Sequence, residues 1–159
     1  MGYALAPLAV ILMYLGLQMI EHQTANSVPG AGILGSMKNS MHVAAEQAEM
    51  WGTACTTTAA EASGIISSAI QVTLPSGVNE PNTAGCITTP APSNGRNVYA
   101  YISAPHGVAG QVLSATNMNY TWYRVTANGE ATNLVDGSIL TVPAVIPLAD
   151  LVEYELTSN

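Results

Sequence analysis

An apolar run from Tyr3 to Ile20 constrains this chain more than any other feature of its sequence. It contains no charged residue, and its one amide is Gln18. A helix over these residues would rise ~27 Å, close to the ~30 Å hydrocarbon thickness of a bilayer. Pro7 falls in the first turns of such a helix, where its missing N–H costs least. The sequence therefore predicts an N-terminal segment long enough to span a membrane.

Three interpretations of this run remain open. The first is an uncleaved membrane anchor, whose apolar residues would be Tyr3, Leu8, Val10, Ile11, Leu12, Leu15, Leu17 and Ile20. The second is a cleaved signal peptide, which needs a positively charged start and a small-residue cleavage site; no Lys or Arg precedes the apolar core, and the residues after it match such a site poorly. The third is a buried helix of a globular domain. Because only two residues precede the run, we expect the domain to lie C-terminal to it.

The charge balance excludes several classes of partner. Lys and Arg number 3 against 10 Asp and Glu, and charged residues make up 8% of the chain, against about 25% in an ordinary soluble domain. Three cations cannot neutralise a run of phosphates. We therefore expect no nucleic-acid partner and no polybasic attachment to anionic lipid. A domain this poor in ions has few charges to desolvate on assembly, and we expect neighbouring subunits to cover it.

Composition divides the chain into three parts. Residues 1–22 form the apolar, membrane-spanning segment. Residues 23–35 hold a proline and three glycines, which predict a hinge. Residues 36–159 are predicted to form one extracytoplasmic domain. Apolar residues recur there at three- and four-residue steps as far as Cys55, so we expect an amphipathic helix with Ser36 as its N-cap.

The second half of the domain is predicted to be β. Alternating segments rich in strand formers lie at 97–102, 120–125, 139–142 and 151–154. Asn128-Gly129 predicts a hairpin after the second of them. Residues 79–95 are rich in Pro, Asn, Thr and Gly and are predicted to be a surface loop. The expected class is α+β: a transmembrane or extended N-terminal helix, then an amphipathic helix packed on a mostly antiparallel sheet, a pilin-like architecture.

Cys55 and Cys86 are the two cysteines of the chain, and their spacing fits neither a C-x-x-C motif nor a zinc site. They can be two buried free thiols, or one disulfide that joins the end of the amphipathic helix to the loop. The even count beside an apolar N-terminal segment favours the disulfide. A disulfide would place the domain outside the cytoplasm.

The sequence contains no recognisable catalytic or metal-binding constellation. The three histidines are too scattered for a helical metal pair. Glu46 and Glu49 share a helical face, and Glu153 and Glu155 share a strand face, but exposure to solvent explains them better than a pair of catalytic carboxylates. We therefore expect a non-enzymatic protein with no cofactor, no metal and no small-molecule substrate.

Aromatic residues are concentrated on the two central predicted strands, and they fall on both faces of those strands. They are Tyr99, Tyr101, Tyr120, Trp122 and Tyr123. One face should pack on the amphipathic helix. The other face is predicted to be an interface with another subunit, and the alternative is a second layer of core.

The C-terminal half carries a set of turns and alternations that resemble a known family. They are Tyr101-Ile102, the loop from Pro105 to Gly110, a strand entering Asn128-Gly129, and the closing Val142-Pro143, Ile146-Pro147 and Leu151-Val152. In these elements the chain resembles the PilM proteins of conjugative type IVb (thin) pilus systems, which are distinct from the actin-like protein of the same name. The resemblance leaves residues 55–95 unmatched.

That resemblance implies a structural or assembly component of the pilus, with its anchor in the bacterial inner membrane and its domain in the periplasm. The implied partners are other pilus proteins and further copies of the chain itself. One alternative is a pilin-like subunit of the extracellular filament, although Leu5 stands where a pilin carries Glu. A second alternative is a secreted binding module whose apolar run is a cleaved signal peptide. The family supplies no catalytic residues.

Overall fold

The computed structural model describes residues 32–92 and 94–158. In chain order the elements are α2 (Ile33–Glu61), β1 (Gly85–Pro90), β2 (Gly95–Ile102), α3 (Val108–Ala115), β3 (Trp122–Ala127), β4 (Glu130–Asn133), β5 (Ile139–Thr141) and β6 (Leu151–Ser158). The chain divides into two compact units, with the boundary between Ser40 and Met41 inside α2. The predicted membrane anchor over residues 1–22 lies outside the described residues. In the part of the chain that is described, no helix combines the length and the apolar character needed to cross a membrane.

The first unit contributes the opening turns of α2. The N–H of Ser36 donates to the Gly32 carbonyl at 2.9 Å, and the helix begins at Ile33 rather than at the expected N-cap, Ser36. Residues 33–35, which composition assigns to the hinge, are therefore helical. The low helix propensity of a single glycine costs about 1 kcal/mol, which continuous helical hydrogen bonding outweighs.

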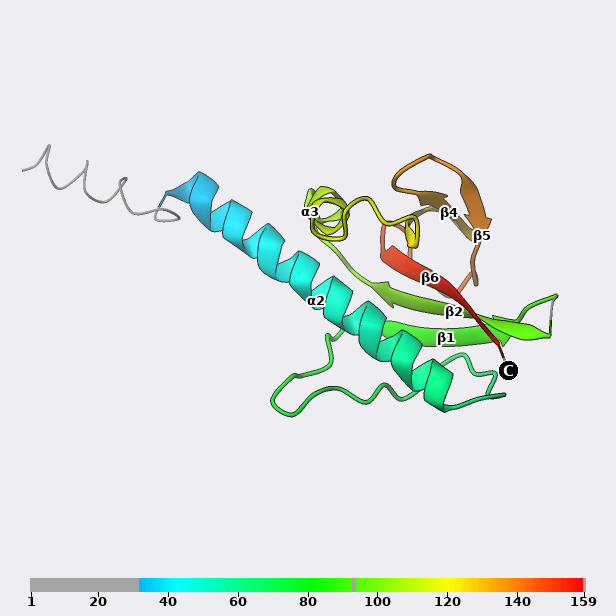
Figure 1. Ribbon diagram of the computed structural model, residues 1–159. Coiled ribbons are helices and arrows are strands. Elements are labelled where there is room, and N and C mark those ends of the chain that lie inside the picture. The colour runs from blue at the N-terminus through cyan, green and yellow to red at the C-terminus, as the bar shows by residue number, and fades with distance from the viewer. Residues whose placement is uncertain (1–31, 93, 159) are drawn as a thin grey trace, which may run out of the picture. The chain divides into compact units, whose positions relative to one another are not determined.

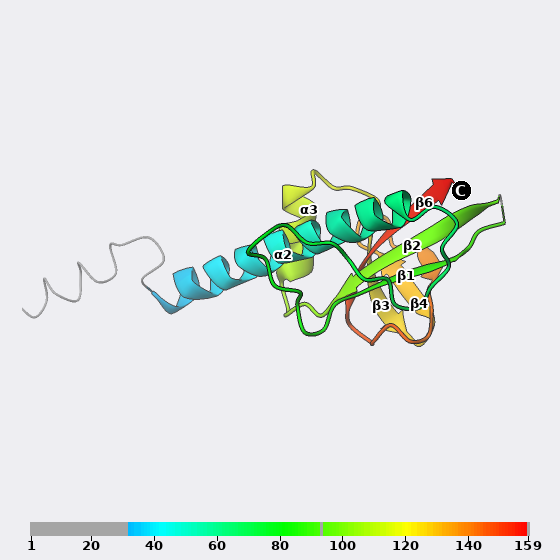
Figure 2. The same ribbon diagram turned by 90° about the horizontal axis from the view of Figure 1, so that it is seen from below.

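In the second unit, α2 packs on one face of the sheet, as Figures 1 and 2 show. Its buried face consists of Ala45, Ala48, Trp51, Gly52, Cys55 and Ala59, at the three- and four-residue steps expected of an amphipathic helix. These side chains form one core cluster with Val98, Ala100, Ile102 and Leu151 of the sheet. The helix continues through three threonines to Glu61, because burial of Ala59 offsets their weak helix propensity.

The sheet has six strands in the order β1-β2-β6-β3-β4-β5, and every neighbouring pair is antiparallel. The four predicted strand segments correspond to β2, β3, β5 and β6, so the α+β class is confirmed. Asn128-Gly129 joins β3 to β4 as predicted, with Gly129 at φ 80°. Figure 1 shows β4 and β5 turned away from the plane of β1 and β2, so the sheet is curled.

The expectation of a surface loop over residues 79–95 is wrong for Gly85–Pro90, which form β1. This strand pairs with β2 from Gly85 opposite Tyr101 to Pro90 opposite Arg96, and its Ile87 is 2% exposed. Its outer edge is covered by the preceding segment: the N–H of Thr88 donates to the Ser67 carbonyl at 2.9 Å. The proline falls at the end of the strand, where a missing N–H does least damage to the ladder.

The second unpredicted element is α3. Pro105–Gly110 is predicted to be a loop, but a helix begins at Val108 directly after Gly107, whose φ of 91° suits glycine. Val108 and Val112 lie one turn apart and are both fully buried in the same core as α2. α2 and α3 therefore cover the same face of the sheet.

A buried arginine joins the end of α2 to the sheet. Arg96 on β2 is 1% exposed. Its Nη2 donates to the Ala59 carbonyl at 2.9 Å, and its Nη1 donates to the carbonyls of Ala62 at 2.8 Å and Ile65 at 3.2 Å. These carbonyls include the ones a helix C-terminus leaves without intrahelical donors, and they lie at the negative end of the helix dipole. The guanidinium therefore acts as a C-terminal cap contributed by a distant strand.

Candidate functional site

The predicted disulfide is present and joins α2 to β1. Cys55 and Cys86 are bonded with their Cα atoms 5.7 Å apart, and both residues are buried in the core between the helix and the sheet. The interpretation as two free thiols is therefore wrong. The disulfide closes a loop over the segment that the family resemblance leaves unmatched.

The aromatic residues occupy both faces of the sheet, as expected. Trp122 lies in the core beneath α2 and is 1% exposed. Tyr99 lies on the opposite face in a second core cluster with Ile87, Val125, Ala131, Val142, Ile146 and Val152. Tyr154 on β6 extends this face: its ring centroid lies 5.5 Å from that of Tyr99 and 6.1 Å from that of Tyr123. For Tyr99 the structure matches the alternative of a second core layer.

The remaining aromatic residues differ in what they leave accessible. Tyr101 and Tyr123 are half-buried at the margin of the second core, and Tyr120, just before β3, is 60% exposed. Tyr99 is 5% exposed and so has little surface to offer a partner. The predicted interface on this face thus has Tyr101 and Tyr123 as its available residues, and it stays a prediction.

On the helix-covered face, Glu153 of β6 lies between the strand and α2. A side chain at Gly52 of the helix would collide with the Glu153 carboxyl group, so the glycine provides the space that the glutamate occupies. The hydroxyl of Thr121 donates to Glu153 Oε1 at 3.4 Å, while Oε2 is buried and has no partner among the described residues. The expectation that solvent surrounds this carboxylate is therefore wrong.

The pKa of Glu153 is raised from its ordinary 4.5 to about 7, and burial is the largest cause. Charge repulsion from Glu155 and Glu49 contributes to the rise, and the hydrogen bond from Thr121 opposes it. Burial is the largest of these causes, because removing a carboxylate from water penalises its charged form. Near neutral pH, Glu153 is therefore divided between its neutral and charged forms.

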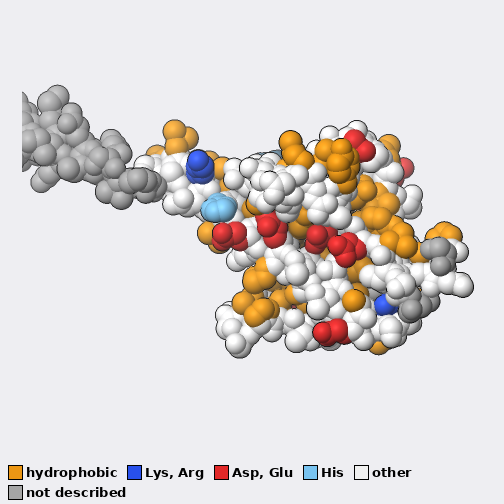
Figure 3. All heavy atoms as spheres, in the orientation of Figure 1, with side chains coloured by type: hydrophobic (Ala, Val, Ile, Leu, Met, Phe, Trp, Pro, Cys, Tyr) orange, Lys and Arg blue, Asp and Glu red, His pale blue; other side chains and the backbone are white. Residues whose placement is uncertain are grey.

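Glu153 belongs to an acidic row that also contains Glu46 and Glu49 of α2 and Glu155 of β6. Burial and the charge of Glu46 raise the pKa of Glu49, while His42 lowers it. Glu49 Oε1 is buried and has no partner among the described residues. Figure 3 shows acidic side chains in a row across this face of the molecule, beside hydrophobic patches. Helix and strand thus bring together two glutamate pairs that lie about a hundred residues apart in the sequence.

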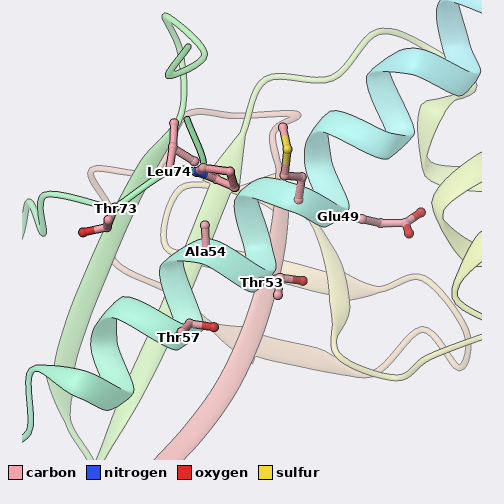
Figure 4. Close-up of a pocket in the computed structure, with 8 residues that line it drawn as sticks. Glu49, Thr53, Ala54, Thr57, Thr73 and Leu74 are labelled. Atoms are coloured by element: carbon pink, nitrogen blue, oxygen red, sulfur yellow. The ribbon is translucent and has the colours of Figure 1, made fainter. Parts of the chain in front are cut away.

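Next to the acidic row, α2 forms one wall of a shallow groove of about 550 Å³. The lining residues are Glu49, Met50, Thr53, Ala54, Thr57, Thr73, Leu74 and Pro75. Figure 4 shows α2 on one side of the groove and the segment of Thr73 and Leu74 on the other, with the Glu49 carboxylate pointing away from Leu74 on the opposite side of the helix. Apart from Glu49, the lining consists of apolar side chains and threonines.

Two features of the sequence are consistent with the buried carboxylate of Glu153. Glu153 alternates with Val152 and Tyr154 and so falls on the same strand face as the fully buried Leu151. Gly52 is a lone glycine within a helical pattern, which can indicate close approach of another group. Taken together they point to a carboxylate beneath a helix, but only the register between α2 and β6 shows that they meet.

The remaining titratable residues form no further site in the described ranges. His42 lies on α2 with its Nε2 3.5 Å from Glu46 Oε1, in an exposed pair. No group of three or more His, Cys, Asp or Glu side chains that could hold a metal ion is found within residues 32–92 and 94–158. Asp150 is buried, and burial raises its pKa.

Comparison with solved structures finds one protein of similar fold. It is a crystal structure of an Escherichia coli B7A protein assigned as PilM, which matches with a TM-score of 0.50 and 18% sequence identity over 75% of this chain and 94% of that chain. No protein-family model and no curated protein sequence matches. At this identity the likeness shows a common fold, which agrees with the PilM resemblance noted in the sequence.

Proposed function

We propose that this chain is a non-enzymatic structural or assembly component of a type IVb conjugative pilus. In this proposal residues 1–22 anchor it in the bacterial inner membrane, and the α+β domain faces the periplasm. The observation that supports it most is the fold shared with the PilM-assigned protein over 94% of that chain. The name of that protein is also the name of the family that the turn motifs in this sequence resemble.

The Cys55–Cys86 disulfide supports the proposed compartment. Disulfides form and persist in the periplasm and outside the cell, and they are rare in the cytosol. Both cysteines are buried, so the disulfide is a structural element of the fold rather than an exposed reactive group.

The composition of the domain supports a role in assembly. Its low charge reduces the number of ions that lose water when subunits meet. Tyr120 offers an exposed aromatic side chain, a residue type enriched at interfaces. The partners proposed are other pilus proteins and further copies of the chain.

A second candidate is a subunit of the pilus filament itself. The start of α2 favours it, because Ile33 is 82% exposed and Leu34 is 84% exposed, on a helix that follows the apolar run in sequence. Such residues suit helix packing within a fibre. In this alternative the protein is extracellular after assembly.

Mass spectrometry of the N-terminus in separated fractions tests these proposals. We expect to find the chain in the inner membrane with Met1 and the apolar run intact. In a mating assay, we expect deletion of the gene to lower conjugation frequency and plasmid-borne protein to restore it. Intact chains in sheared filaments would instead support the filament subunit. Loss of the first twenty or so residues would overturn both and favour a secreted binding module.

A further inference from the structure

The two edges of the six-stranded sheet differ in how the chain covers them. β1 forms one edge, and the segment before it bonds along that edge, where the N–H of Thr88 donates to the Ser67 carbonyl at 2.9 Å. β5 forms the other edge, on the outer side of β4 (Figure 1). Among residues 32–92 and 94–158, no backbone group bonds to the outer side of β5. Within the described chain, one edge is therefore closed and the other is open.

The register of β5 shows which backbone groups the open edge presents. Leu140 lies opposite Ala131 of β4. Two hydrogen-bonded pairs flank this position in the same ladder, Gly129–Val142 and Asn133–Ser138. Because hydrogen-bonded pairs alternate in an antiparallel ladder, Leu140 bonds to β4, and the N–H and carbonyl groups of Ile139 and Thr141 point away from it. Donors and acceptors at this spacing are the chemistry that another strand satisfies.

The open edge lacks the charged side chains that commonly protect a sheet edge. No charged residue lies between Asp136 and Asp150 in the sequence, and Ile139 is 71% exposed. Pro143 has no N–H, so it limits the open stretch to Ile139–Thr141. A strand that pairs with this stretch would meet exposed apolar surface and no charge.

A second copy of this chain fits the edge because the acidic residues of the two copies stay apart. If two β5 strands pair antiparallel about a two-fold axis at Leu140, Ile139 of each copy lies opposite Thr141 of the other, and all the outward N–H groups meet carbonyls. Glu130 lies one strand further in, opposite Thr141. The two β4 strands would be three strand spacings apart, ~14 Å, whereas the Debye length in physiological salt is ~8 Å. The net charge of −7 therefore contributes little repulsion at this contact.

We propose that the open edge of β5 binds β5 of a second copy, so that two six-stranded sheets join across a two-fold axis at Leu140. The inference deepens the proposed function and rests on it, since it assigns a surface through which copies of an assembly component meet. The backbone groups fix the register, because a shift of two residues would leave the outward groups of Ile139 or of Thr141 unpaired. In the proposed register the two Leu140 side chains become neighbours.

Disulfide crosslinking in phosphatidylcholine vesicles that hold the full chain tests this register. Its two cysteines are bonded to each other, so an introduced cysteine supplies the reactive thiol. Leu140→Cys would place two Cα atoms ~4.5 Å apart, as in a non-hydrogen-bonded pair, which suits a disulfide. Ser138→Cys is the matched control: residue 138 is more exposed, but its two copies would be ~13 Å apart along the strands. We expect a mild oxidant to join Leu140→Cys into dimers at least about tenfold faster than Ser138→Cys.

Further substitutions in the Leu140→Cys chain show what holds the copies together. Thr141→Pro removes an outward N–H that the β4 ladder does not use, and it should slow crosslinking at least about tenfold. Thr141→Val keeps that N–H and should leave the rate unchanged. Ile139→Lys places a cation at an exposed residue and should also slow crosslinking. Circular dichroism checks that each variant keeps the fold of its parent.

Three results would overturn the inference: no dimers of Leu140→Cys, equal rates for Leu140→Cys and Ser138→Cys, or rates that neither Thr141→Pro nor Ile139→Lys changes. In host membranes, a photoreactive residue at position 139 that joins only a different protein would overturn it in favour of a foreign strand. The vesicles hold no other pilus protein. Failed crosslinking therefore leaves the pilus role standing, and failure of that role leaves crosslinking unaffected.

Discussion

The carboxyl group of Glu153 on β6 occupies the space that α2 leaves open at Gly52. Strand and helix therefore meet through a polar side chain in the middle of an otherwise apolar contact. The arrangement fixes both partners, because a larger residue at position 52 and a glutamate at position 153 cannot occupy the same volume. It also introduces a buried acid into the main core.

Substitution of Gly52 tests this fit. In an unhindered helix, Gly→Ala stabilises by about 0.5–1 kcal/mol, because alanine has the higher helix propensity. At Gly52 the added methyl group collides with Glu153, so we expect Gly52→Ala to lower the free energy of unfolding by about 1–3 kcal/mol. Urea unfolding of the full chain in nanodiscs, followed by the fluorescence of Trp51 and Trp122, measures the change.

Gly110 provides the matched control for this substitution. It lies within α3, and no atom is found within 4 Å of a Cβ placed there. Gly110→Ala should therefore stabilise the protein. A stabilising effect of Gly52→Ala, equal to that at Gly110, would contradict the close fit with Glu153.

The titration of Glu153 should make stability fall as pH rises. Its pKa is about 7 in the folded chain and near 4.5 when unfolded, so between these values the folded state holds the extra proton. The free energy of unfolding should therefore decrease from about pH 4.5 to above pH 7, by up to about 3 kcal/mol. Burial raises the pKa of Glu49 and Asp150 as well, which acts in the same direction.

Glu153→Gln separates this residue from the other acids. Gln keeps the shape of the neutral acid, so the variant should match wild type at about pH 4.5 and exceed its stability at about pH 8.5. Unfolding curves at both pH values check this, with Glu130→Gln as a control that should show no such divergence. A constant offset between Glu153→Gln and wild type at the two pH values would refute the assignment.

Removal of the buried Arg96 side chain should cost more than removal of the half-buried Arg124 side chain. Arg96→Met keeps a long apolar chain but leaves the Ala59 carbonyl without its side-chain donor, while the carbonyls of Ala62 and Ile65 keep the Ile65 N–H and the Thr88 hydroxyl as donors. A buried acceptor left unpaired costs about 1–3 kcal/mol, so we expect a loss of that size. Arg124→Met on β3 is the comparison, and a loss of equal size there would show that the capping bonds contribute little.

Reduction of the Cys55–Cys86 disulfide should destabilise the domain without changing its fold. The bond closes a loop across a sequence separation of 31 residues, for which chain entropy gives about 3–4 kcal/mol. The paired variant Cys55→Ala/Cys86→Ala should unfold at a correspondingly lower urea concentration and retain its circular dichroism spectrum. Two reactive thiols in denatured protein from its native host would contradict the proposed periplasmic location.

Tyr99 and Tyr120 should respond differently to truncation. Tyr99→Ala removes a buried ring from the second core and should cost about 3–5 kcal/mol. Tyr120→Ala acts at a 60% exposed ring and should leave stability within about 0.5 kcal/mol. If Tyr120 belongs to an interface, its removal should lower conjugation frequency at normal protein levels, which immunoblotting and mating assays measure together.

Periodic patterns predicted the parts of this fold that repeat in sequence. The helix through Cys55 and the strands around Tyr99, Val125 and Val152 follow from steps of three to four residues and of two residues. The disulfide also followed, from an even cysteine count and an apolar N-terminal segment. The helix and the strands thus follow from local patterns, and the disulfide follows from composition.

The features that were missed depend on contacts between distant segments. β1 contains proline and threonine and is a strand because β2 and residues 65–70 bond to its two edges. α3 contains Gly110 and is a helix because Val108 and Val112 reach a core formed by other elements. In the sequence alone, Arg96 and Glu153 are indistinguishable from ordinary surface charges. Their burial becomes evident only from the positions of β2 and β6 beneath α2. The structure of β1 and α3 and the surroundings of Arg96 and Glu153 all depend on contacts that form only when the chain folds.

The position of β6 has a consequence for the timing of synthesis. β1 and β2 form one hairpin, and β3, β4 and β5 form a meander, but Leu151–Ser158 is the strand that joins the two across the middle of the sheet. A ribosome that adds about 5–20 residues per second makes both halves before it makes the strand between them. For that interval β2 and β3 each expose an unpaired edge that a strand from another nascent chain could occupy. A chaperone that shields the unpaired edges of β2 and β3 would act in the short period before β6 emerges.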